Sequence, residues 1–250
     1  MAPQLYLSLA LATAIGLSLG LLGSGGSIIT LPVLVYVMGV PPRNAIAMSL
    51  VIVGTVSLFG ALLHLRQQRF HLRAVLFLGL TGMVGAYFGS VLTHLVSPRA
   101  LMSLFSVLMI VVGTVMLRRT DLVCVPERCY PARCLTSGAG VGALTGFLGV
   151  GGGFLIVPSL VLLAGIDTKK AVGASLGIIA LNSAAGLAGQ LRFAEFDWTL
   201  TAEFLAVALA GMWLGTLFVG RISPEGLRKA FAWSVVLVGI TIAGATLLQA

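Results

Sequence analysis

Residues 44–65 read NAIAMSLVIVGTVSLFGALLHL, a continuous run without a charged side chain. Five further stretches are almost free of charge: 73–96, 100–117, 171–191, 199–220 and 226–248. Each is close to the length of about 20 residues that an α-helix needs to cross a hydrocarbon core. A transmembrane barrel would instead need alternating segments of about 10 residues. The sequence therefore predicts an all-α integral membrane protein.

The composition supports this fold class. Apolar residues make up 58% of the chain and charged residues only 9%, whereas soluble domains carry about 25% charged residues. The net charge of +8 comes from residues in loops and at helix ends, which is a membrane-orientation pattern. We therefore expect the lipid bilayer as a partner and no nucleic acid. No Lys or Arg precedes Arg43, so the apolar run 5–22 lacks the basic segment of a cleavable signal peptide and is expected to stay in the mature protein.

Two glycine clusters reveal an internal repeat. Gly23–Ser27 aligns with Gly149–Gly153 at an offset of 126 residues (149 minus 23), and the offset holds without a gap almost throughout. It pairs Pro32 with Pro158, Ala45 with Ala171, Ser49 with Ser175, Ser57 with Ser183, Gly85 with Gly211, Gly89 with Gly215, and Ser97-Pro98 with Ser223-Pro224. The predicted domains are a first repeat at 1–117, a cytoplasmic linker at 118–134 and a second repeat at 135–250. Paired repeats of this kind are typical of transporters.

The charges predict how the repeats are oriented. The segment 28–38 is about 16 Å long as a helix, too short to cross the membrane, so each glycine cluster is expected to form the tip of a re-entrant or broken-helix hairpin that precedes three transmembrane helices. The second half is then inverted, and twelve basic residues share one side with three on the other. The alternative, a kinked crossing with parallel halves, gives eight to seven. The positive-inside rule favours the inverted repeat in the inner (plasma) membrane, with both termini outside the cytoplasm.

The paired glycine clusters are candidate substrate-binding segments. In the inverted arrangement they should meet near the middle of the membrane, where non-helical backbone is tolerated only in protein or beside a cavity. The helix starts after them present free N–H groups and a positive dipole end, which suit an anion. The alternative is that the small residues only allow close helix contact. The candidates are Gly23, Ser24, Gly25, Gly26, Ser27, Gly149, Gly151, Gly152 and Gly153.

Polar residues elsewhere in the spans extend this candidate site. Within the spans the only acidic residue is Glu203, about one turn from a helix end; cation transporters usually bury ionisable groups, so an anionic or neutral substrate is favoured. Thr30, Ser49, Ser175, Asn182 and Ser183 can donate hydrogen bonds to an oxyanion, although for each serine a helix contact is the favoured interpretation. A possible anion funnel at the two membrane faces comprises His64, Arg66, Gln190 and Arg192, for which interfacial snorkelling is the alternative.

No metal site or cofactor is predicted. Cys124, Cys129 and Cys134 form a C-x₄-C-x₄-C run in the linker. This spacing is not that of a zinc site, and three thiols leave a tetrahedral site one ligand short. We interpret them as reduced loop cysteines, with a metal-binding, redox or persulfide role as the alternative.

The paired motif resembles the sulfite exporter TauE/SafE family. It reads G-S-G-G-S-I-I-T-L-P-V-L-V-Y-V-M-G-V from 23 and G-V-G-G-G-F-L-I-V-P-S-L-V-L-L-A-G-I from 149, each followed by A-x-x-x-S-L. The resemblance implies a multi-pass permease that exports sulfite or a related organosulfur anion. It assigns motif roles to Gly23, Gly25, Gly26, Pro32, Asn44, Ser49, Gly149, Gly151, Gly152, Gly153, Pro158 and Ser175.

The sequence thus predicts a permease for a small anionic substrate rather than an enzyme, and leaves its oligomeric state open. A membrane scaffold for a sulfur-metabolising system is an alternative function. A second alternative is an intramembrane serine hydrolase built on Ser24 with His64 or His94, although the repeat places Val150 at the position equivalent to Ser24.

Overall fold

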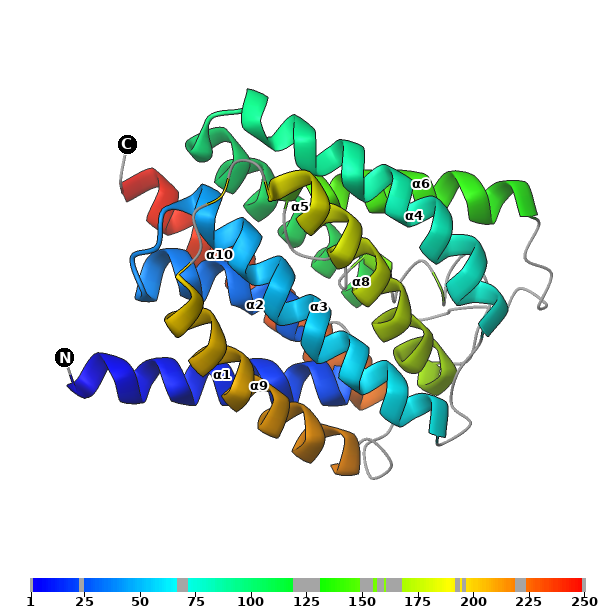
Figure 1. Ribbon diagram of the computed structural model, residues 1–250, viewed down its shortest axis with the longest axis horizontal. Helices are drawn as coiled ribbons and strands as arrows, with labels where there is room; N and C mark the ends of the chain where they lie inside the picture. The colour runs from blue at the N-terminus through cyan, green and yellow to red at the C-terminus, as the bar shows by residue number, and fades with distance from the viewer. Residues whose placement is uncertain are drawn as a thin grey trace.

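The computed structural model is a bundle of helices (Figure 1). It describes residues 2–22, 25–66, 72–118, 131–148, 155–156, 160, 168–191, 194, 197–218 and 224–248. The described part contains no strand. Its elements are α1 (Ala2–Leu22), α2 (Gly25–Pro32), the π-helical turn η1 (Val33–Val37), α3 (Pro42–Arg66), α4 (Leu72–Leu92), the 3₁₀ turn η2 (Thr93–Leu95), α5 (Pro98–Arg118), α6 (Pro131–Leu148), α8 (Thr168–Gln190), α9 (Trp198–Phe218) and α10 (Pro224–Leu248).

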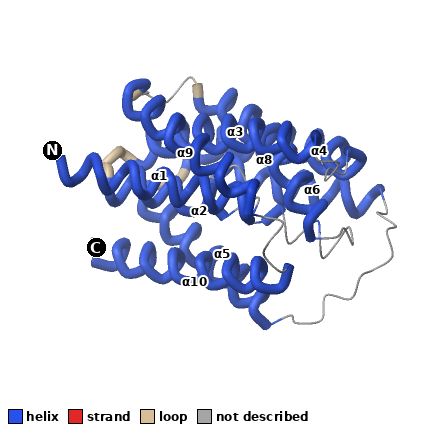
Figure 2. Tube along the Cα trace, turned by 90° about the horizontal axis from the view of Figure 1, so that it is seen from below, coloured by secondary structure: helices blue, strands red, loops and turns tan. Residues whose placement is uncertain are grey.

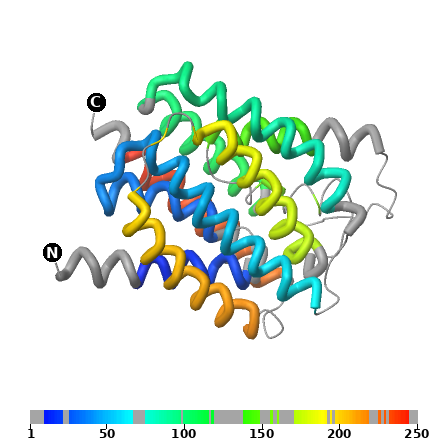
Figure 3. The backbone as a smooth tube through the Cα atoms, viewed as in Figure 1, coloured from blue at the N-terminus to red at the C-terminus, as the bar shows by residue number. Residues whose placement is uncertain are grey.

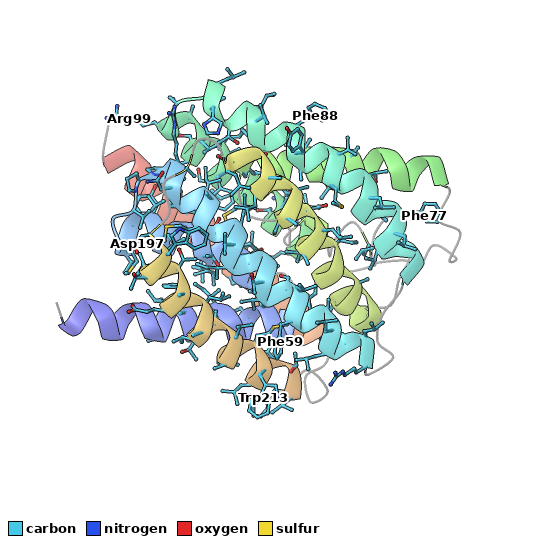
Figure 4. The ribbon with its side chains drawn as sticks, in the orientation of Figure 1. Phe59, Phe77, Phe88, Arg99, Asp197 and Trp213 are labelled. Atoms are coloured by element: carbon cyan, nitrogen blue, oxygen red, sulfur yellow. The ribbon has the colours of Figure 1, made fainter. Side chains whose placement is uncertain are left out.

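Each of the six predicted transmembrane stretches coincides with a helix. Among the described residues, four helices are long and apolar enough to cross a membrane: Pro42–Arg66, Val75–Leu95, Ala171–Gln190 and Trp198–Phe218. The shorter apolar segments Arg99–Val115 and Ala232–Gly244 lie in α5 and α10. Large apolar side chains cover the outside, as Phe59, Phe77, Phe88 and Trp213 illustrate in Figure 4. Such an apolar surface fits a lipid environment rather than water.

Proline and glycine set several helix boundaries. Pro42, Pro98, Pro131 and Pro224 each occupy the first position of a helix, where the missing N–H leaves no intrahelical bond unmade. Before α3 the chain turns at Gly39, whose φ of 69° is a backbone conformation that favours glycine. The repeat is visible in these bounds, because α4 and α9 start and end 126 residues apart, as do the starts of α5 and α10.

Helix α1 is followed by a shorter helical arm, α2 and η1, that packs against it. Pro32 cannot donate a backbone hydrogen bond, and directly after it the helix widens into the π turn η1. This turn closes with Met38 N donating to Val33 O at 3.1 Å and Val40 N donating to Leu34 O at 3.0 Å. The arm predicted at 28–38 is thus a helix that begins slightly earlier, at Gly25, and is interrupted after Pro32. Figure 3 shows the chain return from the end of α1 to the side on which α3 begins.

Helices of the first half of the chain pack against helices of the second half. The helix α1 contacts α9, and α4 contacts α6. Glycine makes both contacts close: Gly16 faces the carbonyl of Ala208, and Gly85 faces the carbonyl of Ala139. Small residues in the contact face commonly allow helices to approach this closely in membranes. A third pair, α5 and α10, forms its own layer in Figure 2, and α3 lies beside α8 at the centre of the bundle (Figure 1).

Candidate functional site

The first glycine cluster is only partly described. Gly23 and Ser24 lie outside the described residues, whereas Gly25, Gly26 and Ser27 open α2. Gly26 lies against the backbone carbonyl of Ile15, and a Cβ built on it would stand 2.6 Å from Leu19 Cγ. Glycine therefore lets α2 return in direct contact with α1, and Ser27 is fully buried beside this contact.

Gly149, Gly151, Gly152, Gly153 and Arg192 also lie outside the described residues. The expected meeting of the two glycine tips near the middle of the membrane therefore stays a prediction. So does the role of Arg192 in a funnel. The linker cysteines Cys124 and Cys129 fall outside as well, and among the described residues no group of three His, Cys, Asp or Glu residues could hold a metal ion.

The candidates on α3 are spread along its whole length. Asn44 lies near its start and Arg66 at its end, about 33 Å apart at the usual helical rise. Ser49 is buried, and its hydroxyl donates to Ile46 O at 2.8 Å. His64 is buried while Arg66 is exposed, because residues two positions apart do not share a helix face. The four side chains thus do not converge on one point.

The candidates on α8 are distributed in the same way. Ser175 donates to Val172 O at 2.7 Å, and Gln190 Nε2 donates to Ser90 O at 3.1 Å, which ties the end of α8 to α4. Between them lies Asn182, whose side chain is only 2% exposed and whose Oδ1 and Nδ2 make no hydrogen bond in the structure.

The crossing of α3 and α8 brings together residues from both repeats. A Cβ built on Gly54 would lie 2.9 Å from Ser183 Cβ, and one on Gly60 would lie 3.1 Å from Leu176 Cδ1. As numbers rise on α3 they fall on α8, so the helices are antiparallel. Ser57 lies three residues from each of these glycines and is therefore near both on the helix surface, but Gly60 also lies against Met212 of α9. Ser183 therefore lies against α3, and Ser57 is about one helical turn along α3 from that contact.

Sequence reasoning named Ser57 only as the repeat partner of Ser183. Both are buried, and their hydroxyls make no hydrogen bond in the structure. The signal in the sequence is that Ser57 and Ser183 occupy equivalent positions. Burying a polar side chain in an apolar span costs free energy, and here the cost arises in both spans. The glycines Gly54 and Gly82, which receive Ser183 and Asn182, carried no distinguishing signal in the sequence.

The charged side chains that the structure describes stay at the surface. None of the described buried side chains is Asp, Glu, Lys or Arg. Asp197 Oδ1 accepts a hydrogen bond from Leu200 N at 3.0 Å and so caps the start of α9. Glu225 and Lys229 form an exposed pair at 2.8 Å on α10, an interaction that contributes little to stability. The interior that the structure describes is thus polar in places but holds no buried Asp, Glu, Lys or Arg.

Comparison with known proteins matches these features to a family. The model of the family described as Sulfite exporter TauE/SafE matches residues 8–242. A probable membrane transporter protein of Xylella fastidiosa is 36% identical over 239 residues, which cover 91% of this chain and 90% of the relative. The probable membrane transporter protein YdhB of Bacillus subtilis is 23% identical over 234 residues, covering 91% and 96%. No solved structure matches the chain. The chain therefore belongs to the sulfite exporter TauE/SafE family.

Proposed function

We propose that this membrane transporter exports a small anion, with sulfite or a related organosulfur anion as the substrate. The observation that carries the proposal is the buried interior of α3 and α8, which holds the hydrogen-bonding side chains of Ser57, Asn182 and Ser183 near mid-helix and, among the described residues, no buried carboxylate. Hydroxyl and amide groups can donate to an oxyanion. A coupled cation, by contrast, usually requires ionisable groups in the membrane interior. The family description and the names of the relatives support transport.

We infer that the transporter works as two inverted repeats, 1–117 and 135–250, joined by the linker 118–134. The shared bounds of α4 and α9 support this division. Direction along the chain supports the inversion: α1 runs from left to right in Figure 1, whereas its repeat partner α6 runs from right to left. Inverted repeats let one half rock against the other around a central site, which exposes that site alternately to the two faces.

We propose an orientation in the membrane that the same picture supports. The start of α1 and the end of α10 lie on one side of the bundle in Figure 1. The end of α3 at Arg66, the end of α5 at Arg118 and the start of α8, which includes Lys169 and Lys170, lie on the other. Because basic residues stay in the cytoplasm, both termini are proposed to lie outside it, with the protein in the cell inner membrane.

Membrane potential alone can drive this export. A potential of 100 mV, negative inside, favours the exit of one negative charge by about 2.3 kcal/mol, which is about fiftyfold in concentration at equilibrium. Because the described interior holds no buried Asp, Glu, Lys or Arg, we propose export that does not depend on a proton or sodium site. Voltage is therefore the variable that the test should control.

The test is flux in liposomes that contain only the purified protein. Sulfite efflux should follow a potassium-set voltage without a pH gradient and should survive His64→Gln and His94→Gln. Sulfate, thiosulfate, sulfoacetate and chloride serve as the comparison panel. Flux that ignores voltage and needs a proton or sodium gradient would contradict the proposed energetics. The absence of flux for every anion would contradict export itself and favour the scaffold alternative.

A further inference from the structure

Four buried polar atoms at the centre of the bundle make no hydrogen bond in the structure. They are Ser57 Oγ, Ser183 Oγ, and Oδ1 and Nδ2 of Asn182. Their side chains are 0%, 1% and 2% exposed, respectively. Leaving a buried donor or acceptor unpaired is costly, and native proteins rarely retain such groups without a reason. The cluster therefore calls for a functional explanation.

The other buried hydroxyls show how this cost is ordinarily avoided. Ser106 donates to Ser103 O at 2.8 Å, and Thr145 donates to Gly142 O at 2.9 Å. Ser49 and Ser175 do the same with carbonyls of their own helices. In a helix such a bond to the preceding turn is always within reach. Ser57 and Ser183 do not make it, and they occupy equivalent positions in the two repeats.

The unpaired atoms lie near the middle of two helices that are long and apolar enough to span a membrane. Ser57 is three residues past the middle of α3, and Asn182 is three residues past the middle of α8, or about 5 Å at the usual helical rise. Gly54 lies against Ser183, so Ser57 is separated from the level of Ser183 by about one helical turn. The two hydroxyls therefore belong to one stretch of the crossing between α3 and α8.

Asn182 directly precedes Ser183 on α8, and its side chain contacts α4. A Cβ built on Gly82 would lie 2.6 Å from Asn182 Oδ1 and 3.0 Å from Nδ2, so the amide lies close against a glycine. Gly82 in turn lies against Gly142 of α6. The amide is thus fixed at a junction of three helices and is adjacent in sequence to Ser183.

We propose that Ser57, Asn182 and Ser183 form the central substrate-binding site and hydrogen-bond a singly charged, protonated oxyanion such as hydrogen sulfite. The two hydroxyls and the amide N–H donate to the anion oxygens, while Asn182 Oδ1 accepts from the proton that the anion carries. A fully deprotonated divalent anion such as sulfate has no proton for Oδ1, which makes it the poorer ligand. This inference rests on the proposed export of a small anion and names where that anion binds.

The test is binding of sodium hydrogen sulfite to the purified full-length chain in detergent, followed by its effect on thermal unfolding. Ser57→Ala and Ser183→Ala should each weaken the apparent affinity about tenfold, and the double variant about a hundredfold, because each removes a hydrogen bond to a charged ligand. Asn182→Leu should weaken the apparent affinity by the same factor as either single serine variant. Without ligand, the alanine variants should melt no lower than wild type, since an unpaired buried hydroxyl is lost.

Ser106→Ala is the matched control. It removes a buried hydroxyl that is paired within α5, and the second repeat already has alanine at the equivalent position, Ala232. This variant should bind hydrogen sulfite as wild type does. It should also melt at or slightly below the wild-type temperature, which separates it from the site variants.

The outcomes distinguish this site from the proposed export. A Ser57→Ala/Ser183→Ala double variant that binds as tightly as wild type would overturn the site, whatever the flux. A wild-type chain that binds hydrogen sulfite but passes none of it in liposomes would overturn export and leave the site in place. Sulfate binding equal to that of hydrogen sulfite would overturn the assigned role of Asn182 Oδ1.

Discussion

Replacing Gly142 by alanine tests the close contact between α6 and α4 in depth. A Cβ on Gly142 would lie against the carbonyl oxygen of Gly82 and 2.6 Å from Gly82 Cα. Backbone atoms cannot rotate away, so the helices must separate. Gly140→Ala is the matched control in the same helix, because a Cβ at Gly140 would meet nothing within 4 Å.

The expected difference between the two variants can be worked out from these distances. Both substitutions gain the same helix propensity, about 1 kcal/mol, which cancels in the comparison. Forcing extra volume into a filled contact costs about 1–3 kcal/mol. In a chain of this size 1 kcal/mol corresponds to about 2–4 °C of melting temperature. We therefore expect Gly142→Ala to melt about 2–12 °C below Gly140→Ala.

The assay is thermal unfolding of the purified protein in detergent, followed by the fluorescence of Trp198, Trp213 and Trp233. The repeat supplies a second instance, since Gly16 lies against the carbonyl of Ala208 as Gly142 lies against that of Gly82. Gly16→Ala should therefore lower the melting temperature by a comparable amount. Equal melting of Gly142→Ala and Gly140→Ala would refute so close an approach of α4 and α6.

Three further predictions concern topology, the hairpin and a helix cap. A reporter that is active only outside the cytoplasm should work when fused after Ala250 and fail when inserted in 118–134. If both fusions report the same side of the membrane, the inverted orientation is contradicted. Gly26→Val should abolish transport while the protein still inserts, because its side chain would strike the backbone of α1; normal flux would mean that the hairpin tolerates opening. Asp197→Ala should lower the melting temperature by about 2–4 °C, because the hydrogen bond that caps α9 is lost. Asp197→Asn should keep this cap and melt near the wild-type temperature.

Much of the fold could be predicted because it depends on apolar length. The run 44–65 corresponds to α3, Pro42–Arg66, and the run 199–220 to α9, Trp198–Phe218. An uninterrupted apolar stretch of this length has one stable conformation in lipid, whatever its neighbours are. The hairpin arm was harder to predict. Pro32 signals an interruption, but the widening into a π turn over 33–37 depends on which carbonyls the following residues reach.

The candidate site could be predicted only as far as residue type. Ser49 and Ser57 are the same residue in the same helix and are equally buried. Nevertheless Ser49 bonds to its own helix and Ser57 does not. Which of the two happens depends on the rotamer and therefore on the helix that crosses at that level. That crossing is a contact between distant parts of the chain, which the local sequence does not encode.

The packing of α1 against α9 has a consequence for how the protein is made. The helix α1 ends at Leu22, but its partner α9 begins only at Trp198, 176 residues later (198 minus 22). At ordinary synthesis rates this interval lasts about 10–35 s. During it the glycine face of α1 must be covered by lipid, by the insertion machinery or by a chaperone. Ribosome pausing or truncation before α9 therefore leaves a membrane intermediate whose first helix has yet to meet its partner.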